Sequence, residues 1–101
     1  MRLRVENAPR ARREMKRKAA SWAKHSTSNP HLFWQEFLAA VRRLSVEPYA
    51  GRRWISRKGK VYWRLLLPQT ENHIYYSYLV EQRLIRVLSV WGARRKNEPR
   101  L

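Results

Sequence analysis

A length of 101 residues, with 44% hydrophobic and 12% aromatic side chains, fits one folded domain and excludes a disordered polycation. The 23 Lys and Arg residues against seven acidic ones leave a formal net charge of +16, which predicts a polyanionic partner: a nucleic acid, an acidic protein or an anionic membrane surface. Because the chain has no cysteine and no apolar run long enough for a membrane span, we expect a cytoplasmic protein without disulfides, metal or cofactor.

The first quarter of the chain predicts a strand followed by a helix. Residues 1–6, with the sequence MRLRVE, alternate apolar and charged side chains, which is the two-residue period of a half-buried strand. Asn7 then offers an N-cap and Pro9 a first-turn proline, and apolar residues recur at helical spacing as far as Trp22. We therefore expect a short first strand and a helix over residues 8–24.

A second helix follows a polar break with the sequence HSTSNP. Asn29 and Pro30 repeat the cap and the first-turn proline, and Pro48 ends the helical pattern. Between them the apolar stripe consists of Phe33, Phe37, Val41 and Leu44, widened by Trp34 and Leu38. Two helices joined by so short a turn should pack as an antiparallel hairpin.

From Tyr49 onward the pattern changes to that of β-strands. Aromatic and β-branched residues dominate, and turn signals occur at Lys58-Gly59, from Pro68 to Asn72, and at Glu81-Gln82. The alternation predicts one face with Val61, Trp63, Leu65 and Leu67, and on the next strand one with Ile74, Tyr76, Tyr78 and Val80. We expect an α+β fold in which the helix hairpin covers one side of an antiparallel meander and leaves the other side bare, with cations gathered there.

The chain has no repeat and no low-complexity tract, so residues 1–101 are expected to form a single domain. Its last eight residues, 94–101, are basic and polar and carry no strand or helix pattern. We expect them to be a mobile tail unless something binds them.

Two groups of cations are candidates for binding a polyanion. One group lies on the first helix, where its members could track phosphates or could simply be solvated. It consists of Arg10, Arg12, Arg13, Lys16, Arg17, Lys18 and Lys24. The other surrounds the turn at Gly59 and consists of Arg52, Arg53, Arg57, Lys58 and Lys60, interleaved with Trp54, Tyr62 and Trp63. Aromatic rings beside cations suit stacking on bases, although alternate aromatic residues in a strand also pack beneath helices.

The residues alone give little indication of catalysis. The glutamates are scattered, there is no Asp, and no paired-carboxylate, metal-binding or nucleophile motif occurs. His73 begins a predicted strand, within possible reach of Arg64, Arg86 and Arg94, so an acid–base group with cationic clamps can be drawn. The alternative is an ordinary surface histidine.

Three stretches of the chain resemble the ParE/RelE family of bacterial type II toxins. They are RARREMKRKAASWAKHSTSNPHLFWQEFLAAVRRLSVEPYAG, RLLLPQTENHIYYSY and LIRVLSVWGARR, and together they cover most of the chain. The spacing of Leu44, Pro48 and Gly51 is similar to that of the family, and the segment 87–95, VLSVWGARR, is the most specific part.

The resemblance implies a toxin that is silenced by an acidic, partly disordered antitoxin. The residues expected to contact the antitoxin are Arg13, Arg17, Trp22 and Arg64. In RelE-like members, cations on the strands contact mRNA inside the ribosome and stabilise charge during its cleavage. In ParE-like members the same scaffold is associated with inhibition of DNA gyrase, so the fold by itself does not decide the function.

Departures from the family pattern favour the ParE-like interpretation. RelE-like nucleases usually have an Arg where His73 stands and a Tyr in the C-terminal tail, whereas no tyrosine follows Tyr78 here. A ParE-like toxin would dock on gyrase, without chemistry of its own, through Arg52, Arg53, Arg57, Lys58, Lys60, Trp91, Arg94, Arg95 and Lys96.

Two alternatives stay open beside the gyrase inhibitor. The first is a ribosome-dependent mRNA endoribonuclease that uses His73, Tyr76, Arg64, Arg86 and Arg94. The second is a non-toxic basic domain that binds nucleic acid. None of the three interpretations requires a small-molecule substrate, a cofactor or a membrane.

Overall fold

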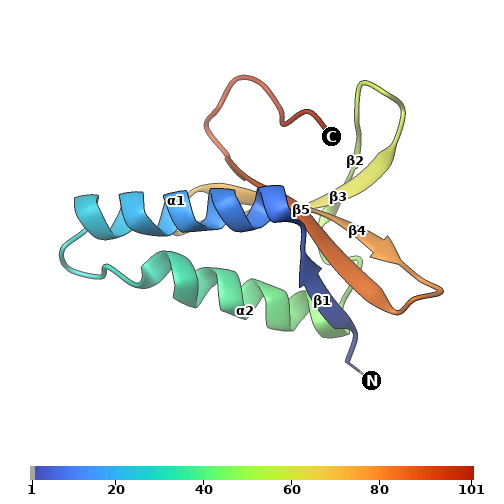
Figure 1. The fold of residues 1–101 in the computed structure, drawn as a ribbon, viewed down its shortest axis with the longest axis horizontal. Coiled ribbons are helices and arrows are strands. Elements are labelled where there is room, and N and C mark those ends of the chain that lie inside the picture. Colours follow the sequence, from blue (N-terminus) through green and yellow to red (C-terminus); the bar gives the residue numbers. More distant parts are fainter. Residues whose placement is uncertain (1) are drawn as a thin grey trace.

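In the computed structural model, which describes residues 2–101, two helices lie against one face of a five-stranded sheet (Figure 1). Along the chain the elements are β1 (Arg4–Asn7), α1 (Pro9–His25), α2 (Leu32–Val46), β2 (Arg52–Ile55), β3 (Val61–Leu67), β4 (Asn72–Leu79) and β5 (Leu84–Gly92). This arrangement confirms the predicted α+β class, with strand, helix hairpin and meander in the expected order. Met1, the first residue of the predicted strand, lies outside the described residues.

The sheet has the strand order β1-β5-β4-β3-β2. Strands β2 to β5 form the predicted antiparallel meander. β1 adds to the outer edge of β5 in parallel, with Arg4 opposite Leu84 and Asn7 opposite Val87. Parallel neighbours need a long connection, which the helices and the intervening strands provide here. The first strand and the last one therefore lie side by side.

The predicted N-caps do not form, although both helices end within two residues of their predicted limits. Ala8 rather than Asn7 precedes α1, because Asn7 is already the last residue of β1. His31 precedes α2, and the backbone carbonyl of Asn29 accepts a hydrogen bond from the Trp22 indole N–H at 3.0 Å. The loop before α2 is therefore held by α1 and not by a cap at Asn29.

The core lies between the helices and the facing side of the sheet. Its buried side chains are Ala11, Met15 and Ala19 of α1, Phe33, Phe37, Ala40 and Leu44 of α2, and Leu65, Leu67, Ile74, Tyr76, Ile85, Val87 and Val90 of the sheet. The predicted alternation thus holds for most of β3 and β4. Val61 and Val80 are exceptions, 44% and 57% exposed, because Val61 begins β3 in the hairpin that extends beyond the helices and Val80 follows the end of β4 (Figure 1).

Two buried carboxylates tie the helices to the sheet. Glu36 of α2 accepts hydrogen bonds from the Gln69 N–H at 2.6 Å, the Thr70 N–H at 3.0 Å and the Thr70 hydroxyl at 2.6 Å. Glu14 of α1 accepts one from the Ser89 hydroxyl at 2.8 Å. A carboxylate is costly to bury without such partners. The bonds therefore fix the β3–β4 turn to α2 and fix β5 to α1.

Candidate functional site on the open face of the sheet

The sheet side that faces away from the helices, here called the open face, carries His73 and Arg64, two of the predicted catalytic residues. Successive side chains of a strand alternate between the two faces, so the neighbours of the core residues point this way. Arg52 of β2 lies opposite Arg64 of β3, and Arg64 lies opposite Tyr75 of β4. By the same register the open face includes Arg52, Trp54, Tyr62, Arg64, Leu66, His73, Tyr75 and Trp91.

His73 and Arg64 line a hollow of about 370 Å³, the His73 hollow, together with Arg52, Leu66 and the loop over residues 50–51. Burial, and then the positive charge of Arg64, lower the pKa of His73 below its ordinary value. The imidazole is therefore neutral at neutral pH. Neither of its ring nitrogens makes a hydrogen bond within residues 2–101, so both are available to a ligand.

Aromatic rings flank the His73 hollow. The ring of Tyr75 lies 6.1 Å from that of His73, edge to face, and Trp54 packs on Tyr75 and on Tyr62 at centroid distances of 5.0 and 5.8 Å. Trp54 and Tyr62 therefore lie on the open face and not beneath the helices, whereas Trp63 packs against the core. Rings beside cations on one surface are what contact with single-stranded nucleic acid requires.

The structure does not bring Tyr76 into the His73 hollow. Its side chain faces the core, where its hydroxyl donates to the Pro48 carbonyl at 2.9 Å and accepts from the Gly51 N–H at 3.0 Å. Burial raises the pKa of Tyr76. This tyrosine braces the loop beside the hollow, and its placement argues against the catalytic role suggested by the resemblance.

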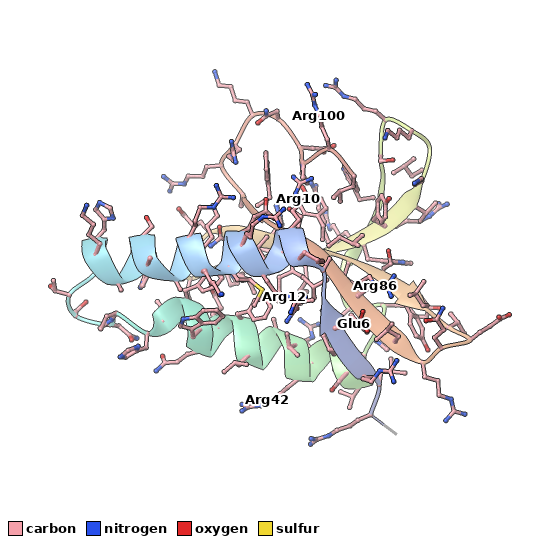
Figure 2. All side chains as sticks on the ribbon, in the orientation of Figure 1. Glu6, Arg10, Arg12, Arg42, Arg86 and Arg100 are labelled. Atoms are coloured by element: carbon pink, nitrogen blue, oxygen red, sulfur yellow. The ribbon has the colours of Figure 1, made fainter. Side chains whose placement is uncertain are left out.

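Two of the predicted arginine clamps also lie elsewhere. Arg86 pairs with Glu6 at 3.4 Å, at the β1 edge of the sheet (Figure 2). Arg94 is exposed and pairs with Glu71 at 2.8 Å, in the turn between β3 and β4. Of the predicted catalytic residues, the His73 hollow therefore contains only His73 and Arg64, with Arg52 as an additional cation.

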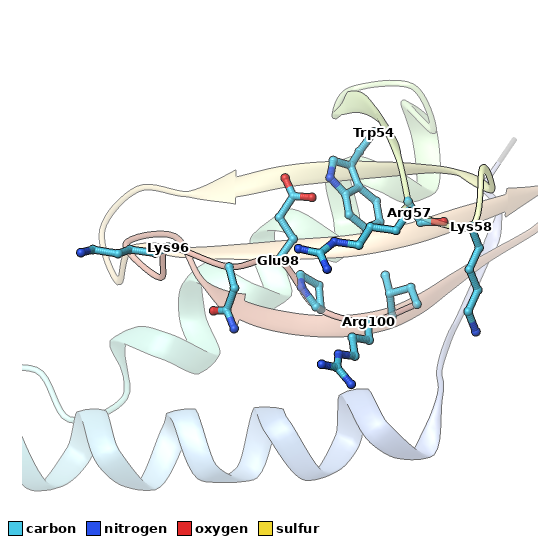
Figure 3. Close-up of a pocket in the computed structure, with 10 residues that line it drawn as sticks. Trp54, Arg57, Lys58, Lys96, Glu98 and Arg100 are labelled. Atoms are coloured by element: carbon cyan, nitrogen blue, oxygen red, sulfur yellow. The ribbon is translucent and has the colours of Figure 1, made fainter.

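The cations predicted to dock on a target do not form one patch. Arg57, Lys58 and Lys96 line a second hollow, of about 240 Å³, beside Trp54 (Figure 3). Arg52 belongs to the His73 hollow instead. The β2–β3 turn and the tail thus contribute cations to the open face from two sides.

The remaining target-binding candidates lie outside both hollows. Arg53 is opposite Trp63 and so faces the helix side of the sheet. Lys60 is exposed between β2 and β3. Arg95 stacks on Trp91, with its guanidinium carbon 3.8 Å from the ring centre.

A groove between α1 and β5, the α1 groove, contains two of the residues predicted to contact an antitoxin. Arg13 and Arg17 line it, and neither forms an ion pair within residues 2–101. The groove has a volume of about 620 Å³, and its other cations are Arg10, Lys18 and Arg95. Burial, and then the charge of Arg95, lower the pKa of Lys18 below its ordinary value.

The other two antitoxin candidates lie apart from that pair. Trp22 packs partly into the core and lines a neighbouring hollow with Arg94 and Arg95. Arg64 is on the open face. The predicted antitoxin surface is therefore not one continuous patch.

The chain's own C terminus covers part of the open face. Residues 96–101 turn back toward Trp54 (Figure 3). The Glu98 carboxylate lies 3.7 Å from the Arg64 guanidinium. Pro99 is buried. The expectation of a bare sheet side is therefore wrong in this region, whereas the mobility of the tail stays a prediction.

Comparison with known proteins shows the fold. No protein-family model matches the sequence, and no curated protein sequence matches it. The structure is similar to a chain of the crystal structure of the intact E. coli RelBE toxin-antitoxin complex, with a TM-score of 0.52 and 15% sequence identity, over 92% of this chain and 99% of that chain. The fold is therefore RelE-like.

Residues 2–101 contain neither a side-chain cluster suited to a metal ion nor a helix suited to crossing a membrane. No group of three or more His or Glu side chains there could hold a metal ion. No helix in the same part of the chain has both the length and the apolar character needed to cross a bilayer.

Proposed function

We propose that this chain with a RelE-like fold is the toxin of a type II toxin–antitoxin pair and that it cleaves RNA. The observation that carries the proposal is the His73 hollow, where a neutral imidazole lies beside Arg64 and Arg52. Similarity to a chain of the RelBE complex supports the toxin assignment. This is the RelE-like alternative, and not the ParE-like one that the departures from the family pattern favour.

The chemistry follows from the side chains that the hollow contains. A neutral imidazole can take the proton from a ribose 2′-hydroxyl, which then attacks the adjacent phosphorus. The products are a 2′,3′-cyclic phosphate and a 5′-hydroxyl, which receives its proton from the imidazolium. Arg64 and Arg52 would hold the phosphate oxygens and offset the negative charge that develops on them. The substrate must be RNA, because DNA lacks the attacking hydroxyl.

Inducible expression in bacteria tests this proposal with a matched pair of histidine variants. The wild-type chain should arrest growth and produce discrete cuts in translated mRNA, and His73→Ala should abolish the cuts. His31→Ala is the control, because His31 is exposed and lies at the start of α2. Intact transcripts in arrested cells would exclude RNA cleavage. Growth without arrest, with the protein folded and present, would favour the non-toxic nucleic-acid-binding domain.

The second candidate function is inhibition of DNA gyrase. One observation favours it: apart from His73, no side chain that lines the His73 hollow can serve as an acid or a base near neutral pH. A gyrase inhibitor needs no acid–base pair and would bind through exposed cations such as Arg94 and Lys96. Purified protein should then reduce supercoiling or accumulate cleaved DNA–gyrase complexes, and unchanged gyrase activity would exclude this candidate.

The proposal includes an acidic antitoxin as the partner that neutralises the toxin. Arg13 and Arg17 in the α1 groove are the residues we assign to it, because their charges are unpaired within the described chain. The proposal also places the protein in the cytoplasm, where gyrase, ribosomes and mRNA are found. A short acidic reading frame beside this one, whose product protects cells and copurifies with the chain, is the expected result.

A further inference from the structure

The last six residues, 96–101, form a return segment that starts just after β5. Ala93 N–H donates to the Glu71 carbonyl at 2.9 Å, and Arg95 N–H donates to the Gly92 carbonyl at 3.2 Å, which turns the chain. The chain then comes back toward β2, so that its C terminus lies beside the β2–β3 hairpin (Figure 1).

Contacts with three elements hold the return segment in place. The Trp91 indole N–H of β5 donates to the Asn97 carbonyl at 2.8 Å. Arg10 of α1 donates to the Arg100 carbonyl at 2.6 Å. From β3, the guanidinium of Arg64 pairs with Glu98. The segment is therefore placed by side chains distant in sequence, although it has no regular secondary structure of its own.

The pair between Glu98 and Arg64 connects the segment to the His73 hollow. Arg64 lines that hollow, and it is also the cation that lowers the pKa of His73. A carboxylate of the chain thus occupies one side of the arginine that an incoming phosphate would need. The same segment lines the second hollow together with Trp54, the largest ring on this part of the open face (Figure 3).

The geometry also makes this contact easy to displace. The Arg64 and Glu98 side chains are 32% and 52% exposed and 3.7 Å apart, and exposed pairs of this kind are weak. A phosphate can bind a guanidinium with two parallel hydrogen bonds, which is stronger. Only Pro99 in the segment is buried, so little apolar surface opposes its release.

We propose that the return segment is an intramolecular ligand of the open face, with Glu98 at the position of a phosphate, and that single-stranded RNA must displace it to reach Arg64 and His73. The identity of the ligand as RNA depends on the proposed function, whereas competition between the segment and an anion does not. The favoured ligand is a single strand because cations and stacked aromatic rings alternate along this surface.

Affinity for a short fluorescent oligouridylate, measured at one fixed salt concentration, tests the proposal. The chain ending at Lys96 and the Glu98→Gln variant should both bind up to about fivefold more tightly than the full chain, as expected for loss of an exposed ion pair. The truncation removes one Glu and one Arg, so the formal net charge does not change. Glu81→Gln is the control for Glu98→Gln, because it removes the same charge from an exposed turn beyond β4.

Arg64→Gln in the truncated chain should cancel the increase in affinity for oligouridylate, because that increase comes from the Arg64 guanidinium that the truncation frees. Equal affinities of full and shortened chains, or equal gains for Glu81→Gln and Glu98→Gln, would overturn the proposal. Weaker binding after truncation would also overturn it, since the segment would then assist the ligand. A gain for polyglutamate but not for oligouridylate would assign the face to an acidic protein and refute the RNA form.

Hydrogen exchange separates this proposal from the proposed function. Oligouridylate should speed the exchange of the Trp91 indole N–H, which donates to the Asn97 carbonyl, while it protects amides near Arg64. A tail-dependent affinity in a protein that neither arrests growth nor cuts mRNA would leave the competition intact and reject the nuclease. If the protein cleaves mRNA but truncation does not change its affinity for oligouridylate, the nuclease is supported and the competition is rejected.

Discussion

Replacing Glu36 by alanine should destabilise the fold and loosen the start of the strand that carries His73. Oε1 of Glu36 accepts both the N–H and the hydroxyl of Thr70, and Oε2 accepts the N–H of Gln69. Thr70 in turn accepts hydrogen bonds from the Asn72 amide through its carbonyl and its hydroxyl. Since Asn72 begins β4, one carboxylate holds the turn that positions His73.

The size of the loss follows from the donors that would be left unpaired. Thr70 is buried, so leaving its N–H and its hydroxyl without a partner should each lower the free energy of unfolding by about 1–3 kcal/mol. The Gln69 N–H belongs to an exposed residue and can bind water instead. Glu36→Ala should therefore lower the free energy of unfolding by about 2–6 kcal/mol, a large fraction of the total for a small domain. Glu36→Gln should lose only about 1–2 kcal/mol, because its carbonyl oxygen can still accept from Thr70.

Urea unfolding followed by tryptophan fluorescence measures these differences. Glu47→Ala, directly after the last residue of the same helix, is the control, because the pair of Glu47 with Arg43 is exposed and should contribute at most about 1 kcal/mol. Unfolding of Glu36→Ala and Glu47→Ala at the same urea concentration would contradict this role of Glu36, and so would a Glu36→Gln variant as unstable as Glu36→Ala.

Further predictions concern the hollow and the groove. Folding lowers the pKa of His73, so the free energy of unfolding should decrease as the pH drops below the ordinary histidine pKa of about 6.5. In urea titrations between about pH 7.5 and pH 5, His73→Gln should make this decrease smaller. In the same measurement Gly51→Ala should lower the free energy of unfolding by at least about 1–3 kcal/mol, since the added Cβ would lie 2.5 Å from a β3 carbonyl oxygen. Arg13→Glu with Arg17→Glu should abolish rescue by the coexpressed antitoxin, whereas Arg42→Glu on the exposed side of α2 should not; rescue of both would remove the α1 groove from the antitoxin surface.

The two buried glutamates show why the sequence analysis missed part of the structure. In the sequence Glu14 and Glu36 are two of seven scattered glutamates, and a glutamate in a helix is usually solvated. Their partners lie 75 and 34 residues away along the chain, so no local pattern identifies them. One signal was present: both lie three residues after a buried apolar residue, Ala11 or Phe33, and therefore on the apolar stripe.

The separation of His73 from Tyr76 could have been predicted. Two residues at an odd spacing in one strand point to opposite faces. The same alternation that placed Tyr76 with Ile74 on the core face therefore excluded a shared site with His73. The family resemblance suggested both residues, and the register of β4 brings only one of them to the open face.

Local periodicity determined the α+β class, both helices and the meander, because apolar spacing and turn residues act over a few positions. The net charge likewise required no structure to indicate an anionic partner. Only the tertiary structure decided that β1 pairs in parallel with β5, that Arg64 joins Arg52 beside His73, and that Glu98 returns to Arg64. These contacts join residues far apart in the chain, and their formation depends on register and on long-range charge pairing, which no short window of sequence contains.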